Sequence, residues 1–194
     1  MPSEDDTIKS IKKMQLRVML VSGVAGLGLV AILGWVVIDT GLHVTGDYEF
    51  CTSCHNTMAP MAIAYKNDLH GGKNPAGWRA RCVDCHLPHD NALHHLFVKA
   101  RHGIVDSYME WTTEPLDIDW HGNRKNRESF VYDSGCLSCH KYLADASRAN
   151  RKAFHLHRVY FARNSGMQCV SCHQHVGHHE LGDQLLKLGW EAAR

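Results

Sequence analysis

The chain lacks a strong excess of either charge. Its 194 residues include 21 Lys and Arg against 20 Asp and Glu, for a formal net charge of +1. It also lacks any stretch that combines a row of basic residues with interleaved aromatic side chains, the usual mark of a nucleic-acid-binding surface. We therefore expect no nucleic-acid partner.

Beyond its N-terminal region the chain has little Leu, Ile or Val, and no segment alternates apolar and polar residues as a strand would. A domain this poor in aliphatic side chains would struggle to bury a core of its own. The length predicts one domain plus a targeting element. We expect a mainly α fold with little or no β structure.

No cysteine is left over once a single motif has been counted. The pattern Cys-x-x-Cys-His occurs four times and uses all eight cysteines. We call the copies motif 1 (residues 51–55), motif 2 (82–86), motif 3 (136–140) and motif 4 (169–173). Their cysteines are Cys51, Cys54, Cys82, Cys85, Cys136, Cys139, Cys169 and Cys172, and their histidines are His55, His86, His140 and His173.

This motif is the attachment signature of a c-type haem, in which two thiols bind the porphyrin and the His gives the iron one axial nitrogen. Four disulfides or paired zinc sites would also use eight cysteines, but neither explains a His after every second cysteine. We therefore predict four covalently bound haems c, which would also supply the missing apolar core.

Residues 18–38 form a run of 21 residues without a charge, long enough to cross a bilayer as a helix. A cleaved signal peptide usually has a shorter apolar region and a small-residue cleavage site, so we favour an uncleaved anchor. Four cations precede the run within residues 1–17, and acidic residues follow it. We expect a cytoplasmic N-terminus, a single pass through the bacterial inner membrane and a periplasmic domain at 51–194.

Residues 39–50 would then connect the anchor to motif 1. Thr40 to Phe50 reaches at most about 40 Å when fully extended, so the first haem is tethered near the membrane. Helices are expected at 58–70, at 93–111 and at 144–161, with a polar, irregular stretch at 112–135.

The four motifs fall into two pairs, with Cys51 and Cys82 31 residues apart and Cys136 and Cys169 33 apart. A Leu-His step stands 12 residues before the second member of each pair, and further His follow it. This near-repeat predicts two dihaem halves, at about 51–90 and 136–180. The distal iron ligands expected from it are His70, His89, His157 and His178, with His155 and His175 as secondary candidates.

Motif 1 has no such Leu-His partner before it. Met58 and Met61 follow it closely, so Met58 is the candidate ligand at haem 1 and Met61 the secondary one. Ordinary packing of both residues on porphyrin is the alternative. The residues leave open which distal His serves which haem, and also the oligomeric state.

The anchor, the four motifs and two local stretches together resemble the NapC/NirT family of membrane-anchored tetrahaem quinol dehydrogenases, which includes NrfH and CymA. One stretch runs from Asn74 to His89 and contains Asp-Cys-His-Leu-Pro-His. The other runs from Cys169 to His178. His55-Asn56-Thr57-Met58 departs from the Cys-His-x-Met of many members by one residue. The presence of a His at position 89 resembles the NapC and CymA branches of the family.

The resemblance implies that quinol, in our reading menaquinol, is oxidised near haem 1 and that electrons pass to a periplasmic reductase or soluble cytochrome in anaerobic respiration. It implies Asp84 as the acid at the quinol site, assisted by Lys73, with Arg79 and Arg81 as rivals. Three alternatives stay open: an electron relay without a quinone site, a quinone reductase fed by a periplasmic oxidising enzyme, and an enzyme that reduces a small nitrogen or sulfur compound itself.

Overall fold

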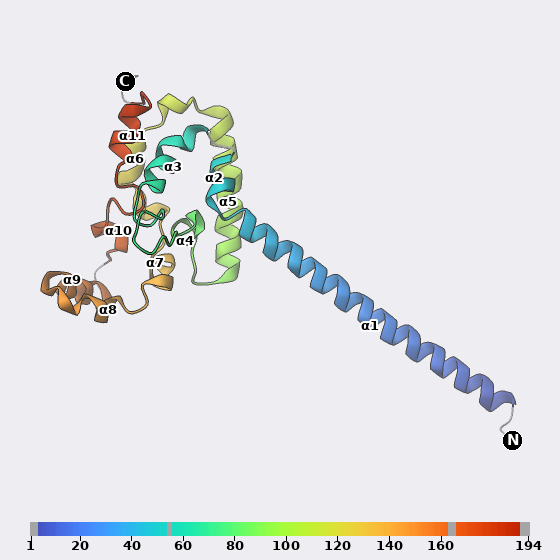
Figure 1. Ribbon diagram of the computed structural model, residues 1–194. Coiled ribbons are helices and arrows are strands. Elements are labelled where there is room, and N and C mark those ends of the chain that lie inside the picture. Colours follow the sequence, from blue (N-terminus) through green and yellow to red (C-terminus); the bar gives the residue numbers. More distant parts are fainter. Residues whose placement is uncertain (1–3, 54–55, 163–165, 191–194) are drawn as a thin grey trace. The chain divides into compact units, whose positions relative to one another are not determined.

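The computed structural model describes residues 4–53, 56–162 and 166–190 (Figure 1). It divides into two compact units, Met1–Thr45 and Gly46–Arg194. Within the described ranges every regular element is an α- or 3-10 helix, and no residue there is assigned to a strand. The mainly α prediction is therefore confirmed.

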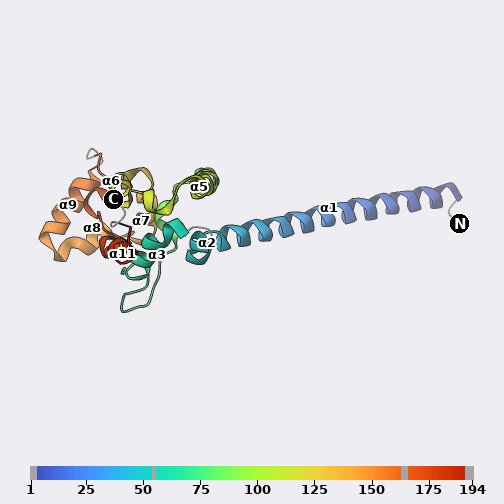
Figure 2. The ribbon, with the colours of Figure 1, turned by 90° about the horizontal axis from the view of Figure 1, so that it is seen from above.

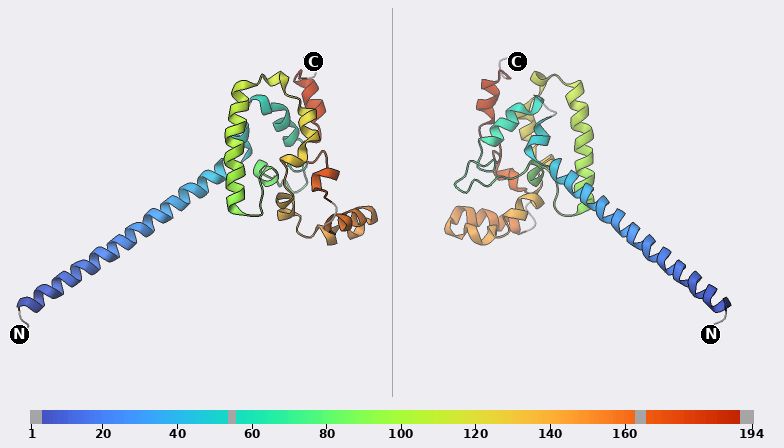
Figure 3. Two further views of the ribbon diagram at one scale, coloured as in Figure 1. Left: turned by 180° about the vertical axis from the view of Figure 1, so that it is seen from behind. Right: turned by 45° about the vertical axis from the view of Figure 1, so that its right-hand side comes forward.

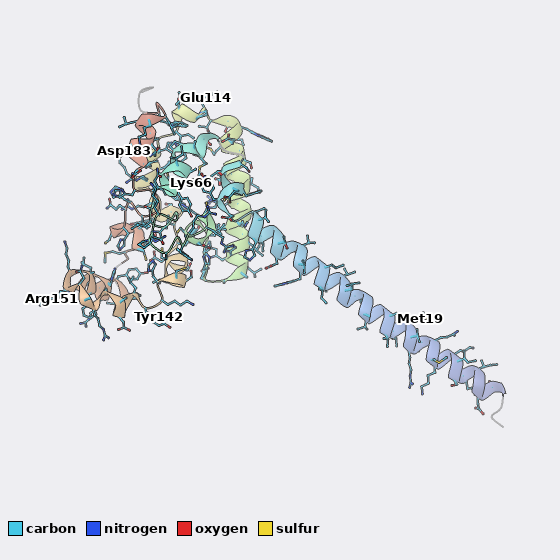
Figure 4. The ribbon with its side chains drawn as sticks, viewed as in Figure 1. Met19, Lys66, Glu114, Tyr142, Arg151 and Asp183 are labelled. Carbon is cyan, nitrogen blue, oxygen red and sulfur yellow. The ribbon has the colours of Figure 1, made fainter. Side chains whose placement is uncertain are left out.

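The first unit is one long helix, α1 (Glu4–Val44), 41 residues in length. An 18-residue window within its segment Ile8–Val44 has a mean hydropathy of 2.3, and α1 is the one helix among the described residues that is long and apolar enough to cross a membrane. Side chains such as Met19 project from the helix and are exposed (Figure 4). The helix continues six residues past the charge-free run, so much of the expected connector at 39–50 is helical.

The second unit contains ten short or medium α-helices in the described ranges, joined by turns and 3-10 segments. They are α2 (Tyr48–Ser53), α3 (Ala59–Lys66), α4 (Cys82–His86), α5 (Ala92–Thr112), α6 (Trp120–Lys125), α7 (Asp133–Cys139), α8 (Leu143–Ala146), α9 (Arg151–Phe161), α10 (Cys169–Cys172) and α11 (Leu181–Lys187). Figure 3 shows α5 along one edge of this unit and the pair α8–α9 at another.

Three expected elements differ from the structure. The helix expected at 58–70 ends at Lys66, where Asn67 caps it in the helical region, so it stops before the glycines Gly71 and Gly72. The stretch 112–135, expected to be irregular, holds α6 because Asp119 caps its first turn. The helix expected at 144–161 is broken into α8 and α9, since the Asn150 side chain caps a new helix start.

Two small clusters make up the aliphatic core of the second unit. One joins α3, α6 and α11 through Ala64, Trp120, Leu181 and Leu185. The other comprises Val83, Leu87 and Val98, and it joins α4 to α5. Tyr65 is also buried, and its hydroxyl is satisfied because it donates to the Ala80 carbonyl. Both clusters are modest for a unit of this size, as the shortage of Leu, Ile and Val predicts.

Candidate haem sites

The cysteine motifs sit on short helices that begin at or just before the first cysteine. In α4 the cap residue Arg81 is extended, and its backbone N–H donates to the Asp84 carboxylate at 2.8 Å. In α10 the cap residue Gln168 donates in the same way to the hydroxyl of Ser171 at 2.9 Å. A capped turn of this kind puts two cysteines three residues apart on one helix face, as attachment to a single porphyrin needs.

Three histidine pairs have the spacing of two axial ligands on one metal. In each pair one histidine belongs to a motif and the other lies outside the motifs in the sequence. The pairs are His86 with His178, His140 with His70, and His173 with His157. Their imidazole centroids are 6.2 to 6.3 Å apart. Because an imidazole nitrogen binds a first-row metal at about 2.0 Å, two imidazoles on opposite sides of one iron have centroids roughly 6 Å apart.

At motif 2, hydrogen bonds to backbone carbonyls determine which ring nitrogen of each histidine carries the proton. His86 Nδ1 lies 3.0 Å from the Phe130 carbonyl, and His178 Nδ1 lies 3.0 Å from the Met61 carbonyl. A carbonyl accepts only from N–H, so both rings carry their proton on Nδ1 and present an unprotonated Nε2. Burial lowers the pKa of His86 and lowers that of His178 to about 4, which keeps both rings neutral.

The other two pairs are supported differently. At motif 3, His70 Nδ1 lies 3.4 Å from the Asp68 carboxylate, which is only 8% exposed. At motif 4, His157 Nδ1 is buried without a hydrogen-bond partner among the residues that the structure describes. A buried polar nitrogen without a hydrogen-bond partner is energetically unfavourable, and such a group in a native structure often marks a site where a metal or cofactor binds. The residues at all three pairs therefore fit a six-coordinate haem iron.

Contacts between the motifs place them in a series. The Cys51 and Cys82 side chains lie close enough to interact, which lowers the pKa of Cys51 and raises that of Cys82. The Cys136 and Cys169 side chains interact in the same way. Motif 1 thus touches motif 2, and motif 3 touches motif 4. The seven cysteines in the described ranges form no disulfide with one another.

Motifs 2 and 3 meet through helix α4 packed on α7. The Tyr132 backbone N–H donates to the Cys85 carbonyl at 3.0 Å. The pKa of Cys85 is raised to about 11, first by burial, then by Asp84 and by Cys139 across the interface. The motifs therefore follow one another in space in the order 1, 2, 3, 4, as they do in the sequence.

Several predicted ligands are not paired in this way. His89 is exposed, and its ring contacts His95 edge-on with centroids 5.5 Å apart. His155 is exposed, and His175 is exposed beside the Arg124 guanidinium, which lowers its pKa. Met61 packs against the cluster around Ala64. None of these four faces a motif histidine among the described residues.

Motif 1 is described in part. Cys54 and His55 lie outside the described residues. Met58 is in a 3-10 turn directly after them and is 37% exposed. Beside it, Thr57 is buried, and its hydroxyl donates to the Glu110 carboxylate of α5 at 2.5 Å. Helix α5 also brings Lys99 close enough to Cys51 to lower its pKa.

The carboxylate implied for the quinol site is held in place by its own helix start. Asp84 Oδ1 accepts from the Arg81 guanidinium at 3.1 Å, and its side chain is 20% exposed. His89 Nε2 lies 4.0 Å from the same oxygen. Arg79 instead lies 3.9 Å from both Asp47 and Glu49, and Lys73 is exposed. The structure thus pairs Asp84 with Arg81, not with Arg79.

Sequence reasoning missed Asp68, Thr57 and Glu110. Asp68 stands two residues before a predicted ligand, the spacing at which a short acid binds a backbone N–H, and it does accept from His70 N at 2.9 Å. Thr57 and Glu110 are 53 residues apart, and no local pattern links them.

Residues 10–183 match the model of the NapC/NirT cytochrome c family, N-terminal region. The chain belongs to the NapC/NirT cytochrome c family. It is therefore a c-type cytochrome of electron transport, as the motifs and their paired histidines predict.

Relatives within this family are similar over most of the chain. TorY of Escherichia coli O157:H7 is 30% identical over 86% of this chain, but the chain spans only 45% of TorY. A protein of Allochromatium vinosum named "Putative tetraheme cytochrome-c type" is 34% identical over 89% of this chain and 91% of its own length. NapC of Escherichia coli strain K12 is 26% identical over 86% of this chain and 83% of its own length.

A solved structure is also similar. A chain from the crystal structure of the cytochrome c nitrite reductase NrfHA complex bound to the HQNO inhibitor is 28% identical, with a TM-score of 0.48. The likeness covers 82% of this chain and 90% of that chain.

Proposed function

We propose that this chain is a membrane-anchored tetrahaem cytochrome that oxidises quinol, with menaquinol as the leading candidate, beside motif 1 and delivers the electrons to a periplasmic reductase. Four haems c, bound through the four motifs, would supply the one-electron carriers. His70, His157 and His178 are the proposed distal ligands, and Met58 remains the proposed ligand at motif 1. The remaining steps belong to side chains of this chain.

One observation carries the quinol proposal. Motif 2 is the neighbour of motif 1, since Cys82 lies beside Cys51, and Asp84 is the one carboxylate within motif 2. The motif next to the proposed electron acceptor therefore carries a carboxylate of its own. Oxidation of one quinol to quinone releases two electrons and two protons, so a site beside an electron acceptor also needs a proton acceptor.

Asp84 is built for that second task. Its Oδ1 is oriented by the Arg81 guanidinium, while the exposed His89 lies 4.0 Å away on the solvent side. A proton taken by the carboxylate has a short route to the His89 imidazole and then to water. In this arrangement Arg81 orients the carboxylate, Asp84 accepts the proton and His89 passes it on. Lys73 and Arg79 remain candidates for binding the quinol oxygen.

The opposite end of the motif series offers a place for the electron acceptor. Helix α9 contributes His157, which faces His173 of motif 4, and α8 packs on α9. Residues 141–161 carry five cations against one carboxylate, Asp145. The cations are Lys141, Arg148, Arg151, Lys152 and Arg158, and all are exposed. Figure 4 shows Tyr142 and Arg151 on the outside of this lobe. An acidic partner surface would dock here.

The test is quinol-driven haem reduction by the purified full chain in detergent or nanodiscs, followed at the c-haem absorption band. Asp84→Asn should slow this reduction about a hundredfold, as loss of a general base does, while dithionite still reduces all haems. Asp90→Asn is the matched control, since Asp90 is an exposed acid of the following loop paired with His94. Wild-type haems that stay oxidised with quinol would favour a relay without a quinone site.

A further inference from the structure

Helix α5 is amphipathic, but its apolar face points away from the second unit and not into it, as it would in a soluble domain. One face carries Leu93, Phe97, Ile104, Tyr108 and Trp111, which follow one another at helical spacing. These side chains are 79%, 69%, 73%, 64% and 87% exposed. The sequence pattern alone would assign such a stripe to the core. The structure instead turns it away from the second unit, which lies entirely to one side of α5 in Figure 2.

Several charged and polar residues of α5 lie on the face turned toward the unit. Glu110 accepts from Thr57, and His95 Nδ1 lies 2.9 Å from the Pro88 carbonyl. Lys99 and Asp106 both lie close enough to Cys51 to affect its pKa. Val98 is the one buried residue of the helix and packs on motif 2. Both acids of α5 are thus on the inner face, and the outer stripe has no carboxylate.

The stripe is long for an exposed surface. From Leu93 to Trp111 it runs 18 residues, about 27 Å along the helix axis. Monomeric soluble proteins rarely expose a continuous apolar patch of this kind unless something covers it. The aromatic residues Tyr108 and Trp111 at one end, with Arg101 beside the stripe, match the composition of helices that lie in a membrane interface.

The tether points to lipid as the cover. The charge-free run ends at Ile38, and α1 continues to Val44, six residues or about 9 Å further. The second unit begins at Gly46. The polar layer on each side of a bilayer is about 5–8 Å thick, so a spanning α1 starts the second unit at the outer limit of the headgroups. An apolar face of that unit that turns toward the bilayer can then reach lipid.

We propose that the outer face of α5 lies in the outer interface of the same bilayer that α1 spans. The contact would hold the inner face of α5, and with it motif 1 and motif 2, against the membrane surface. The inference depends on the membrane anchoring in the proposed function but not on the quinol chemistry. The partner is a lipid surface, and the alternative cover is a second copy of α5.

The experiment uses the full chain in nanodiscs of phosphatidylethanolamine and phosphatidylglycerol that contain a phospholipid with a diazirine near the top of one acyl chain. After illumination, labelled peptides are counted by mass spectrometry, with α1 as internal standard. The α5 peptide should carry roughly tenfold more label than the α9 and α11 peptides. Equal labelling of the three peptides would overturn the proposal.

A double variant tests the stripe itself. Phe97→Glu with Ile104→Glu should lower α5 labelling roughly tenfold, because carboxylates are expelled from the interface. Leu186→Glu is the matched control, since Leu186 is 64% exposed on α11, and it should change nothing. Unchanged α5 labelling in the double variant, or α5–α5 crosslinks between two copies in place of lipid label, would refute lipid contact. The haem spectrum of each variant verifies folding.

Quinol-driven haem reduction in the same discs separates the two proposals. A labelled α5 without quinol reduction would remove the quinol function and keep the membrane contact. Quinol reduction with an unlabelled α5 would do the reverse.

Discussion

Gly135 of α7 lies so close to the backbone carbonyl oxygen of Asp84 in α4 that a β-carbon on Gly135 would fall well inside van der Waals contact. The neighbour is backbone, so it cannot rotate away as a side chain would. This glycine therefore sets how closely motif 2 approaches motif 3. It also ties the position of Asp84 to the junction between the two halves of the chain.

Replacing that glycine should separate the two motifs. Gly135→Val forces α4 and α7 apart and should destabilise the second unit by about 1–3 kcal/mol, seen as a melting temperature lower by several degrees. Circular dichroism of the holoprotein measures it. Gly103→Ala is the control, because no atom lies within 4 Å of its Cβ position. It should melt no lower than the wild type, since Ala favours a helix. A Gly135→Val protein with wild-type melting would contradict the close approach.

Asp68 should tune the haem of motif 3 most strongly. A buried carboxylate 3.4 Å from His70 Nδ1 makes that imidazole a stronger donor and favours ferric iron. Asp68→Asn should raise the potential of one haem by on the order of 50 mV in a spectroscopic redox titration. A smaller shift is expected at motif 2, because Asp68 also acts on His178 and Cys85. Asp183→Asn, an exposed acid on α11, should leave all four potentials unchanged. Four wild-type potentials in Asp68→Asn would argue against the carboxylate–histidine link.

Each proposed distal histidine should serve one iron. His70→Ala, His157→Ala and His178→Ala should each convert one low-spin haem to high-spin, and a double variant should convert two, by electron paramagnetic resonance. His155→Ala should convert none, because its ring is exposed and faces no motif. The assignment to His157 would be wrong if the His155 variant gave the new high-spin signal and the His157 variant did not.

The basic surface formed by the five cations of residues 141–161, called the lobe here, should select electron acceptors by charge. Arg151→Glu with Lys152→Glu should slow oxidation of the reduced protein by ferricyanide several-fold and speed oxidation by hexaammineruthenium(III), with both effects weakening at high salt. Lys125→Glu with Lys187→Glu makes the same charge change on α6 and α11 and should have a smaller effect. Stopped-flow rates decide. Equal effects of the two double variants would mean that net charge, not the lobe, controls the reaction.

The sequence was sufficient for the parts that local pattern determines. The Cys-x-x-Cys-His motifs, the apolar run and the helix at 93–111 are all contained in short stretches. Pairing is not, because it depends on where distant segments meet. The repeat gives His70 and His157 equivalent places, yet His70 faces motif 3 in the other half, while His157 faces motif 4 in its own.

Other features could not be anticipated for a different reason. The stripe on α5 has the period of a core-facing helix, and periodicity does not tell which side of a helix meets solvent, lipid or protein. The resemblance implies Lys73 as the first candidate to assist Asp84, with Arg79 and Arg81 as rivals. The actual partner of Asp84, Arg81, follows from helix capping at α4, which is a local effect that the spacing Arg81-Asp84 already contained.

The crossing of the histidine pairs sets an order of assembly. His178 follows His86 by 92 residues, and His140 follows His70 by 70. If the part of the chain behind the anchor emerges in sequence order, motif 2 is presented long before the residue that faces it arrives. With iron bound as proposed, the last segment to emerge closes the earliest half, and His70 waits in turn for motif 3. Each half then supplies an axial ligand to a haem of the other, so neither half would mature as a separate dihaem fragment. A chain that stopped before residue 178 would lack the distal ligand of its second haem.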